Sequence, residues 1–61
     1  MINDLEHKVF NILLENGEYY YSSDMSVRMK EQAAVNNLEA QGLIKVTLKT
    51  IGYVLADALQ T

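Results

Sequence analysis

The side chains best suited to recognition chemistry lie in the second half of the chain. Gln32, Asn36 and Asn37 carry amides, and an amide can form a bidentate hydrogen bond with adenine in the major groove of DNA. Ala33 lies among them and can contact a thymine methyl group. Four cations flank this segment in the sequence, namely Arg28, Lys30, Lys45 and Lys49. Such cations bind backbone phosphates, a contact that supplies much of the affinity and makes it depend on salt.

The alternative interpretation of these polar residues is an ordinary solvated surface, and other chemistry has less support. His7 is the single histidine and the chain has no cysteine, so no residues of metal-ligand spacing accompany it. The serines at 22, 23 and 26 have no histidine nearby in sequence that would activate them. We therefore expect no enzyme activity, no cofactor and no metal site, and we expect His7 to be solvated.

Charge is unevenly distributed along the chain, although the net charge is −3. Residues 1–24 hold one lysine and five acidic residues, a balance of −4. Residues 25–50 hold four cations and two glutamates, a balance of +2, and Asp57 adds the last negative charge. A phosphate-binding surface would therefore have to come from the middle of the chain and the segment after it.

The length of 61 residues indicates one domain, 1–61, with a marginal core. Association with a second copy would supply apolar burial, so we expect a homo-oligomer. The chain starts Met1-Ile2-Asn3-Asp4, which lacks the basic and apolar regions of a signal peptide. Lys45 and Lys49 interrupt the longest apolar stretch, which excludes a spanning helix. We expect a cytoplasmic protein that does not bind membranes.

The first predicted element is a helix from Asp4 to Asn16, because Leu5, Val9, Ile12 and Leu13 recur at helical spacing. Asn3 and Glu6 can form a capping box at its start, and Gly17 suits its C-terminal stop. The tyrosine-rich run 18–22 is β-prone. We expect a short strand with the Tyr20 side chain on one side and the side chains of Tyr19 and Tyr21 on the other.

Residues 23–41 are helical in pattern, but their apolar side chains fall into two sets. Met25 and Met29 share one helical face, and Ala34, Val35 and Leu38 share another. One straight helix cannot bury both sets against one neighbour, so the pattern predicts two helices joined near 28–30. We expect Ser23 to cap the first of them, Gly42 to end the second, and both methionines to pack in the core.

A β-hairpin is predicted after Gly42. Apolar and polar residues alternate from Ile44 to Lys49, Thr50-Ile51-Gly52 signals a turn, and Tyr53 to Ala56 form the returning strand. Strict alternation would place Lys45 and Lys49 together on the face opposite Val46 and Leu48.

The run Ala34-Val35-Asn36-Asn37-Leu38-Glu39-Ala40-Gln41-Gly42-Leu43-Ile44 resembles the winged helix-turn-helix superfamily, in which a recognition helix ends in Gly-Leu-Ile and a hairpin wing follows. The resemblance spans about residues 4–56. It implies an α+β fold of three helices and a C-terminal β-hairpin wing, with Val35 and Leu38 packed inward. The stretch before the recognition helix is shorter here than in the family, so the second helix is expected to be a turn or two, or fused to the third.

Three functions are compatible with this pattern. The first is a small DNA-binding transcriptional regulator that acts as a homodimer, with Arg28, Lys30, Gln32, Ala33, Asn36, Asn37, Lys45 and Lys49 at the double-stranded DNA. The second is an acidic protein-interaction module on the same scaffold, of the inhibitor or adaptor type that phages and plasmids encode. The third is a dimerisation element of a larger assembly, with an interface that buries residues 32–40. Tyr19, Tyr20 and Tyr21 are candidates for an interface, because tyrosine is enriched in protein contacts; the alternative is one ring in the core and two on the surface.

Overall fold

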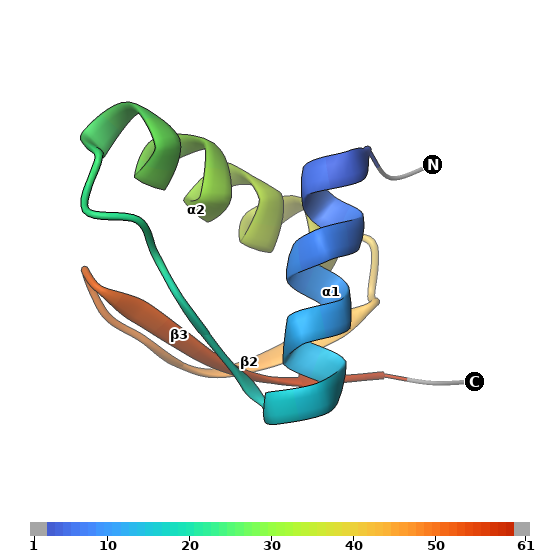
Figure 1. Cartoon of the computed structure of the whole chain (residues 1–61). Coiled ribbons are helices and arrows are strands. Elements are labelled where there is room, and N and C mark those ends of the chain that lie inside the picture. Colours follow the sequence, from blue (N-terminus) through green and yellow to red (C-terminus); the bar gives the residue numbers. More distant parts are fainter. Residues whose placement is uncertain (1–2, 60–61) are drawn as a thin grey trace.

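The chain forms two helices and a three-stranded antiparallel sheet, and the computed structural model describes residues 3–59 (Figure 1). The elements are α1 (Asp4–Asn16), β1 (Glu18–Tyr20), α2 (Met25–Ala40), β2 (Ile44–Lys49) and β3 (Tyr53–Ala58). The α+β class and the C-terminal hairpin agree with the sequence prediction. The count of three helices is wrong, because residues 25–40 form a single helix, as in the alternative of a second helix fused to the third. Neither described helix is long and apolar enough to cross a membrane.

Helix α1 begins and ends where its sequence predicts. The Asn3 Oδ1 accepts a hydrogen bond from the Glu6 N–H at 2.8 Å, and the Glu6 Oε1 accepts one from the Asn3 N–H at 3.0 Å. This reciprocal pair is a complete capping box. At the other end, Gly17 has a φ of 74°, a left-handed conformation that glycine adopts without the steric cost of a Cβ. Its N–H donates to the Leu13 carbonyl and closes the helix.

Helix α2 is continuous because nothing in residues 25–40 breaks it: the segment holds neither glycine nor proline. Only one of its two sets of apolar side chains is buried, and the other set lies in solvent. Met25 and Met29 are 64% and 63% exposed, so the expectation that they fill the core is wrong. The N-cap is also one residue later than expected. Asp24, and not Ser23, accepts hydrogen bonds from the N–H groups of Ser26 and Val27.

The sheet has the strand order β1-β3-β2, and both helices pack on one face of it (Figure 1). Tyr19 is opposite Val54 in the register, and Ile44 is opposite Ala58. Their side chains, together with those of both helices, form the core beneath the helices, which comprises Val9, Leu13, Tyr19, Ala34, Val35, Leu38, Ile44, Val54 and Ala56. Thr50 closes the hairpin, since its N–H donates to the Tyr53 carbonyl at 2.9 Å and its Oγ1 accepts from the Tyr53 N–H at 3.0 Å.

Strand β2 contains a β-bulge that changes which side chains face the helices. Val46 is opposite Ala56, but the next pairs are Leu48 with Leu55 and Lys49 with Val54, so Thr47 is an extra residue. Directly opposed residues in an antiparallel pair lie on the same face of a sheet. Leu48 therefore shares the outer face with Leu55, and Lys49 shares the helix-covered face with the buried Val54. The bulge thus reverses the alternation that the sequence predicts after Val46.

Candidate nucleic-acid interface

The outward face of α2 is exposed over most of its length. Val35 and Leu38 are both 0% exposed, which confirms the prediction that these two residues pack inward. Ala33, Asn36 and Asn37 consequently lie in solvent, whereas Gln32 is half-buried. Three of the four residues predicted to read bases are thus exposed on one helix, and Gln32 is only partly available.

Lys49 lies directly beside this surface. Its Nζ donates a hydrogen bond to the Asn36 Oδ1 at 2.7 Å and lies 3.5 Å from the Glu39 Oε1. All three side chains are exposed, so solvent screens the ion pair and its contribution to stability is small, about 0–1 kcal/mol. The bulge in β2 makes this contact feasible because it turns Lys49 toward α2.

Lys45 lies on the opposite face of the sheet. It is directly opposed to Asp57, and its side chain projects from the face that carries no helix. The sequence prediction that Lys45 and Lys49 project together is therefore wrong, because the extra residue Thr47 places their side chains on opposite faces of the sheet. A surface that includes α2 and Lys49 leaves Lys45 out.

The two remaining predicted cations lie in the first half of α2. Arg28 is half-buried and Lys30 is exposed. Lys30 lines an open groove of about 260 Å³ between α2 and the start of α1, together with Asn37, Ala33, Ala34, Asn3, Leu5 and Glu6. Lys30 and Lys49 thus lie beside α2 on two sides, Lys30 next to α1 and Lys49 next to β2.

Helix α2 carries two glutamates and two cations. Of the two glutamates in the helix, Glu31 is buried and Glu39 lies in the ion pair with Lys49. Helix α2 itself is formally neutral, with Arg28 and Lys30 against two glutamates. The balance of +2 predicted for residues 25–50 therefore comes from Lys45 and Lys49 on β2, of which Lys49 alone lies beside α2.

The three consecutive tyrosines differ in how far their side chains are buried. Tyr19 is buried at 4% exposure, Tyr20 is 64% exposed and Tyr21 is half-buried. The rings of Tyr19 and Tyr21 meet edge to face with centroids 6.0 Å apart, and those of Tyr20 and Tyr53 lie 5.4 Å apart. Tyr19 is thus a core residue and cannot contact a partner, which corrects its assignment as an interface candidate. Tyr20 remains available.

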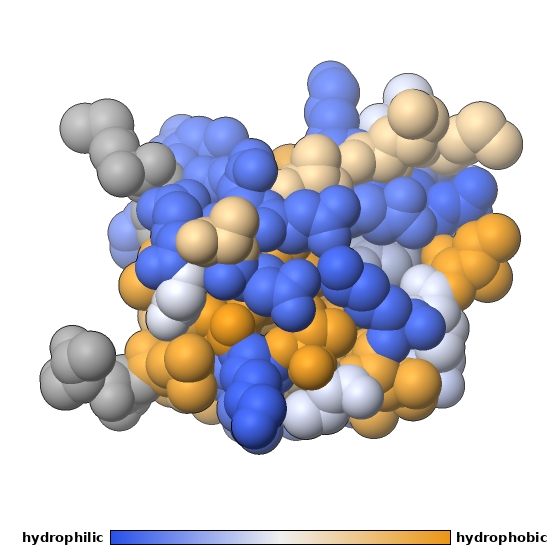
Figure 2. Space-filling view, turned by 180° about the vertical axis from the view of Figure 1, so that it is seen from behind, coloured by the Kyte–Doolittle hydropathy of each residue, from blue (hydrophilic) through white to orange (hydrophobic). Residues whose placement is uncertain are grey.

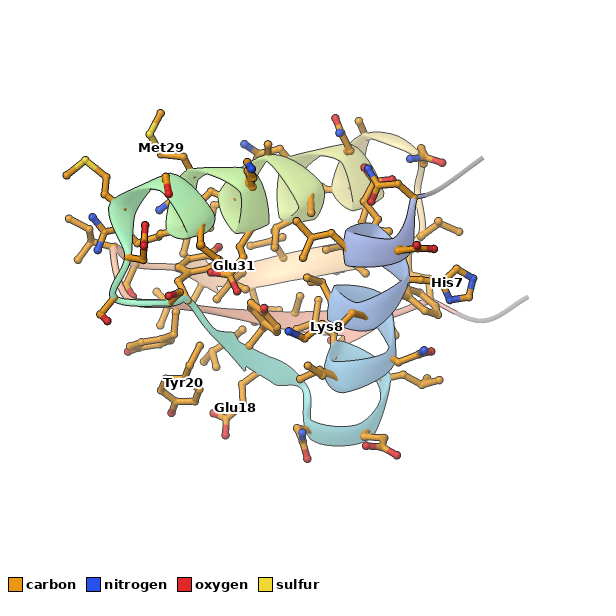
Figure 3. All side chains as sticks on the ribbon, turned by 45° about the horizontal axis from the view of Figure 1, so that its top comes forward. His7, Lys8, Glu18, Tyr20, Met29 and Glu31 are labelled. Carbon is orange, nitrogen blue, oxygen red and sulfur yellow. The ribbon has the colours of Figure 1, made fainter. Side chains whose placement is uncertain are left out.

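A buried carboxylate that the sequence analysis did not identify connects β1 with α2. Glu31 is 5% exposed, accepts a hydrogen bond from the Tyr19 hydroxyl, and accepts a second from the Ser22 N–H at 2.7 Å. Its side chain points from α2 toward the segment that follows β1 (Figure 3). Burial and the neighbouring Glu31 charge raise the pKa of Tyr19 well above its ordinary value. The signal in the sequence was the position of Glu31, four residues before Val35 on the buried row of the helix.

The single histidine and two of the serines named in the sequence analysis lie in different surroundings. The His7 side chain points away from the body of the molecule (Figure 3) and is exposed, which confirms its expected solvation. The Ser22 Oγ accepts from the Asp24 N–H at 3.1 Å and the Ser26 Oγ donates to the Asp24 carboxylate at 2.7 Å, so both hydroxyls belong to the start of α2. Within residues 3–59 there is no group of three or more histidine, cysteine or acidic side chains that can hold a metal ion.

Comparisons of the chain with models of protein families, with curated proteins and with solved structures gave no match. Any functional assignment must therefore come from the residues and their geometry.

Proposed function

We propose that the protein is a small, non-catalytic regulator that binds double-stranded DNA through α2. The proposal treats the fold as a compact winged helix in which α2 is the recognition helix and the hairpin β2–β3 is the wing. The observation that supports it is the uncovered outward face of α2, where Ala33, Asn36 and Asn37 are exposed and Lys49 is hydrogen-bonded to Asn36.

Lys49 has the right chemistry for a phosphate contact at the edge of this face. An ammonium group has three donors, and the Asn36 amide and the Glu39 carboxylate occupy at most two of them. A backbone phosphate can accept from the third or displace the Glu39 carboxylate. Because the ion pair is exposed, giving it up costs little.

The contact with Lys49 also fixes which part of the Asn36 amide is available to a base. An ammonium group only donates, so the Oδ1 must face Lys49. The two N–H groups of the amide are left to donate to acceptors such as the N7 or O6 of guanine or the O4 of thymine. In this arrangement the Asn36 N–H groups read acceptors in the major groove, and a bidentate contact with adenine would have to use the second lone pair of the Oδ1 that already accepts from Lys49.

The wing is smaller in this proposal than the sequence suggested. Lys49 is its phosphate contact, and Lys45 is not used because it lies on the outer face. Lys30 supplies a second cation on the other side of α2. So few cations give one protomer a weak electrostatic footprint on the duplex.

The test is duplex binding by the full chain, measured on a sequence selected from a randomised duplex library. We expect affinity to fall as salt rises. Lys49→Ala should weaken binding to every sequence and reduce the slope of log affinity against log salt by about 1. Asn36→Ala should instead weaken the preference among sequences.

Lys8→Ala is the matched control, because it removes the same charge from an exposed position on α1. Its duplex affinity and salt dependence should equal those of the unmodified protein. DNA binding that responds equally to Lys8→Ala and Lys49→Ala, or a selection in which no duplex is retained, would argue against the proposal.

A protein partner for the same helix face is the second candidate, because Met25 and Met29 are largely exposed there. Met25, Met29, Ala33 and Asn37 follow each other at i,i+4 spacing, so the methionines continue the row of the proposed DNA-contacting residues. Flexible methionine side chains adapt to apolar grooves, and the net charge of −3 suits a basic partner. A complex lost in the Met25→Ser/Met29→Ser variant, with no salt-dependent duplex binding, would favour this function.

A further inference from the structure

The face of the sheet that carries no helix has an apolar centre. Its side chains follow from the register: Tyr20 is opposite Tyr53, and Leu55 lies between Glu18 on β1 and Leu48 on β2. Tyr20 and Leu48 are 64% and 44% exposed. In the space-filling view from behind, hydrophobic side chains in the lower part of the molecule lie on both sides of a hydrophilic one (Figure 2).

Charged residues bound this apolar centre on two sides. Glu18 lies on the edge strand β1, and Lys45 lies on the other edge strand, β2, next to Asp57. The side chains of Glu18 and Tyr20 extend together away from both helices (Figure 3). Among residues 3–59, no carboxylate lies within 4.0 Å of the Lys45 ammonium. Lys45 is therefore free to pair with a carboxylate from outside the chain.

We propose that this outer face is the surface through which two copies of the chain associate. A two-fold interface brings the same patch from both copies together, so the patch must be complementary to itself. An axis lying in the interface plane, between Glu18 and Lys45, exchanges these two positions. Each Glu18 then opposes Lys45 of the other copy, and Leu48 and Leu55 of both copies meet between the two charge pairs, with Tyr20 and Tyr53 at the end of the patch away from Lys45.

The charges on this face also favour a second copy of the chain over a nucleic acid as its binding partner. Exposed tyrosines on a sheet can stack with the bases of a single strand. Here, however, Glu18 and Asp57 adjoin the tyrosine and leucine cluster, and they would repel a phosphate backbone. A second copy offers Lys45 to Glu18 and Glu18 to Lys45, whereas a nucleic acid backbone offers negative charge alone.

The size of the chain points the same way. A typical specific interface buries about 800 Å² on each partner, roughly a fifth of the 4112 Å² that this chain exposes. A domain of this length has a small core, so a shared apolar interface adds substantially to its burial. This inference does not depend on DNA binding, because the face lies on the other side of the sheet from α2.

The experiment is analytical ultracentrifugation of the full chain over a range of concentrations. We expect a monomer–dimer equilibrium, and we expect Leu48→Glu to raise the dissociation constant at least about tenfold by placing a charge in the apolar centre. Leu14→Glu is the matched control: the substitution is the same, and Leu14 on α1 is 43% exposed against 44% for Leu48. It should dimerise like the unmodified protein.

A charge exchange tests the pairing itself. Glu18→Lys and Lys45→Glu should each weaken the dimer about fivefold, since each creates two like-charge pairs, and the double variant should recover affinity. Circular dichroism checks that every variant is folded.

A chain that stays monomeric at all concentrations would overturn the proposal. So would equal effects of Leu48→Glu and Leu14→Glu, or a double variant that recovers nothing. Duplex binding in the Lys49 and Lys8 variants is measured separately, so either proposal can fail alone.

Discussion

At the scale of single residues, the contact between Tyr19 and Glu31 is the main polar interaction in the interior. The Glu31 carboxylate lies on the buried side of α2, where it accepts hydrogen bonds from the Tyr19 hydroxyl and the Ser22 N–H. A buried polar group without a hydrogen-bond partner destabilises the folded state, because its loss of hydration is not compensated. This interaction therefore fixes the path of the chain between β1 and α2.

Tyr19→Phe should destabilise the fold by about 1–3 kcal/mol, because it removes the hydroxyl that donates to the buried Glu31 carboxylate. Urea unfolding followed by circular dichroism measures this difference. Tyr20→Phe is the control: its hydroxyl lies in solvent, 3.4 Å from the Glu18 carboxylate, and its removal should leave the unfolding midpoint unchanged. Equal midpoints for both variants would contradict the role given to Tyr19.

The same pair predicts a loss of stability in alkali. The pKa of Tyr19 is raised in the folded state by burial, by its hydrogen bond to Glu31 and by the charge of Glu31. The folded chain therefore keeps this proton at pH values where the unfolded chain has lost it, and the stabilisation falls as pH rises above the ordinary value of 10.0. Unfolding measured against pH should show a smaller alkaline decline in Tyr19→Phe than in the unmodified protein.

At the scale of elements, the start of α2 depends on the Asp24 carboxylate. It accepts from the Ser26 N–H at 2.9 Å and from the Ser26 hydroxyl at 2.7 Å. These hydrogen bonds, with that of the Val27 N–H, lower the pKa of Asp24. The charged form thus favours folding above the ordinary pKa of 3.8, and this contribution is lost as pH falls through the lowered value.

Asp24→Ala should lower the melting temperature by about 4–8 °C, the usual consequence of losing an N-cap in a domain this small. Ser23→Ala is the control, because Ser23 precedes the cap and its hydroxyl makes no hydrogen bond among the described residues. Differential scanning calorimetry at neutral pH should separate the two variants. A larger loss in Ser23→Ala would place the cap at Ser23.

Helix α1 and the hairpin could be predicted from local signals. The Asn3–Glu6 capping box, Gly17 and the Thr50–Gly52 turn are determined by neighbours in sequence, and all are present. The single helix α2 was wrongly predicted as two helices, because the spacing of apolar residues does not show whether Met25 and Met29 are buried. The bulge at Thr47 was also invisible, since nothing in its neighbours departs from alternation, and for that reason Lys45 and Lys49 were wrongly placed together.

At the scale of the whole molecule, the sheet separates two surfaces of different character. The helix side carries the outward face of α2 with Lys30 and Lys49, and the other side carries the cluster of Tyr20, Tyr53, Leu48 and Leu55. Two copies joined through the sheets would point their α2 helices in opposite directions from the interface. Simultaneous DNA contact by both copies would then require two separate segments of duplex.

Self-association predicts that thermal stability depends on protein concentration. A dimer whose folded state is favoured by the interface melts at a higher temperature as concentration rises. The unmodified protein should show this increase, and Leu48→Glu should show a smaller increase over the same concentrations. Melting followed by circular dichroism over a wide concentration range provides the measurement, with Leu14→Glu again expected to behave like the unmodified protein.

The extra residue at Thr47 also limits how large an assembly of this protein can become. Strand β2 is an edge strand of six residues, and an edge of this length offers unpaired backbone groups to a neighbouring chain. A bulge bends and twists the strand that contains it, which prevents a second edge from aligning with it over its whole length. Continuous growth of one sheet into the next, as in a fibril, is thereby disfavoured, and concentrated solutions should contain small closed particles.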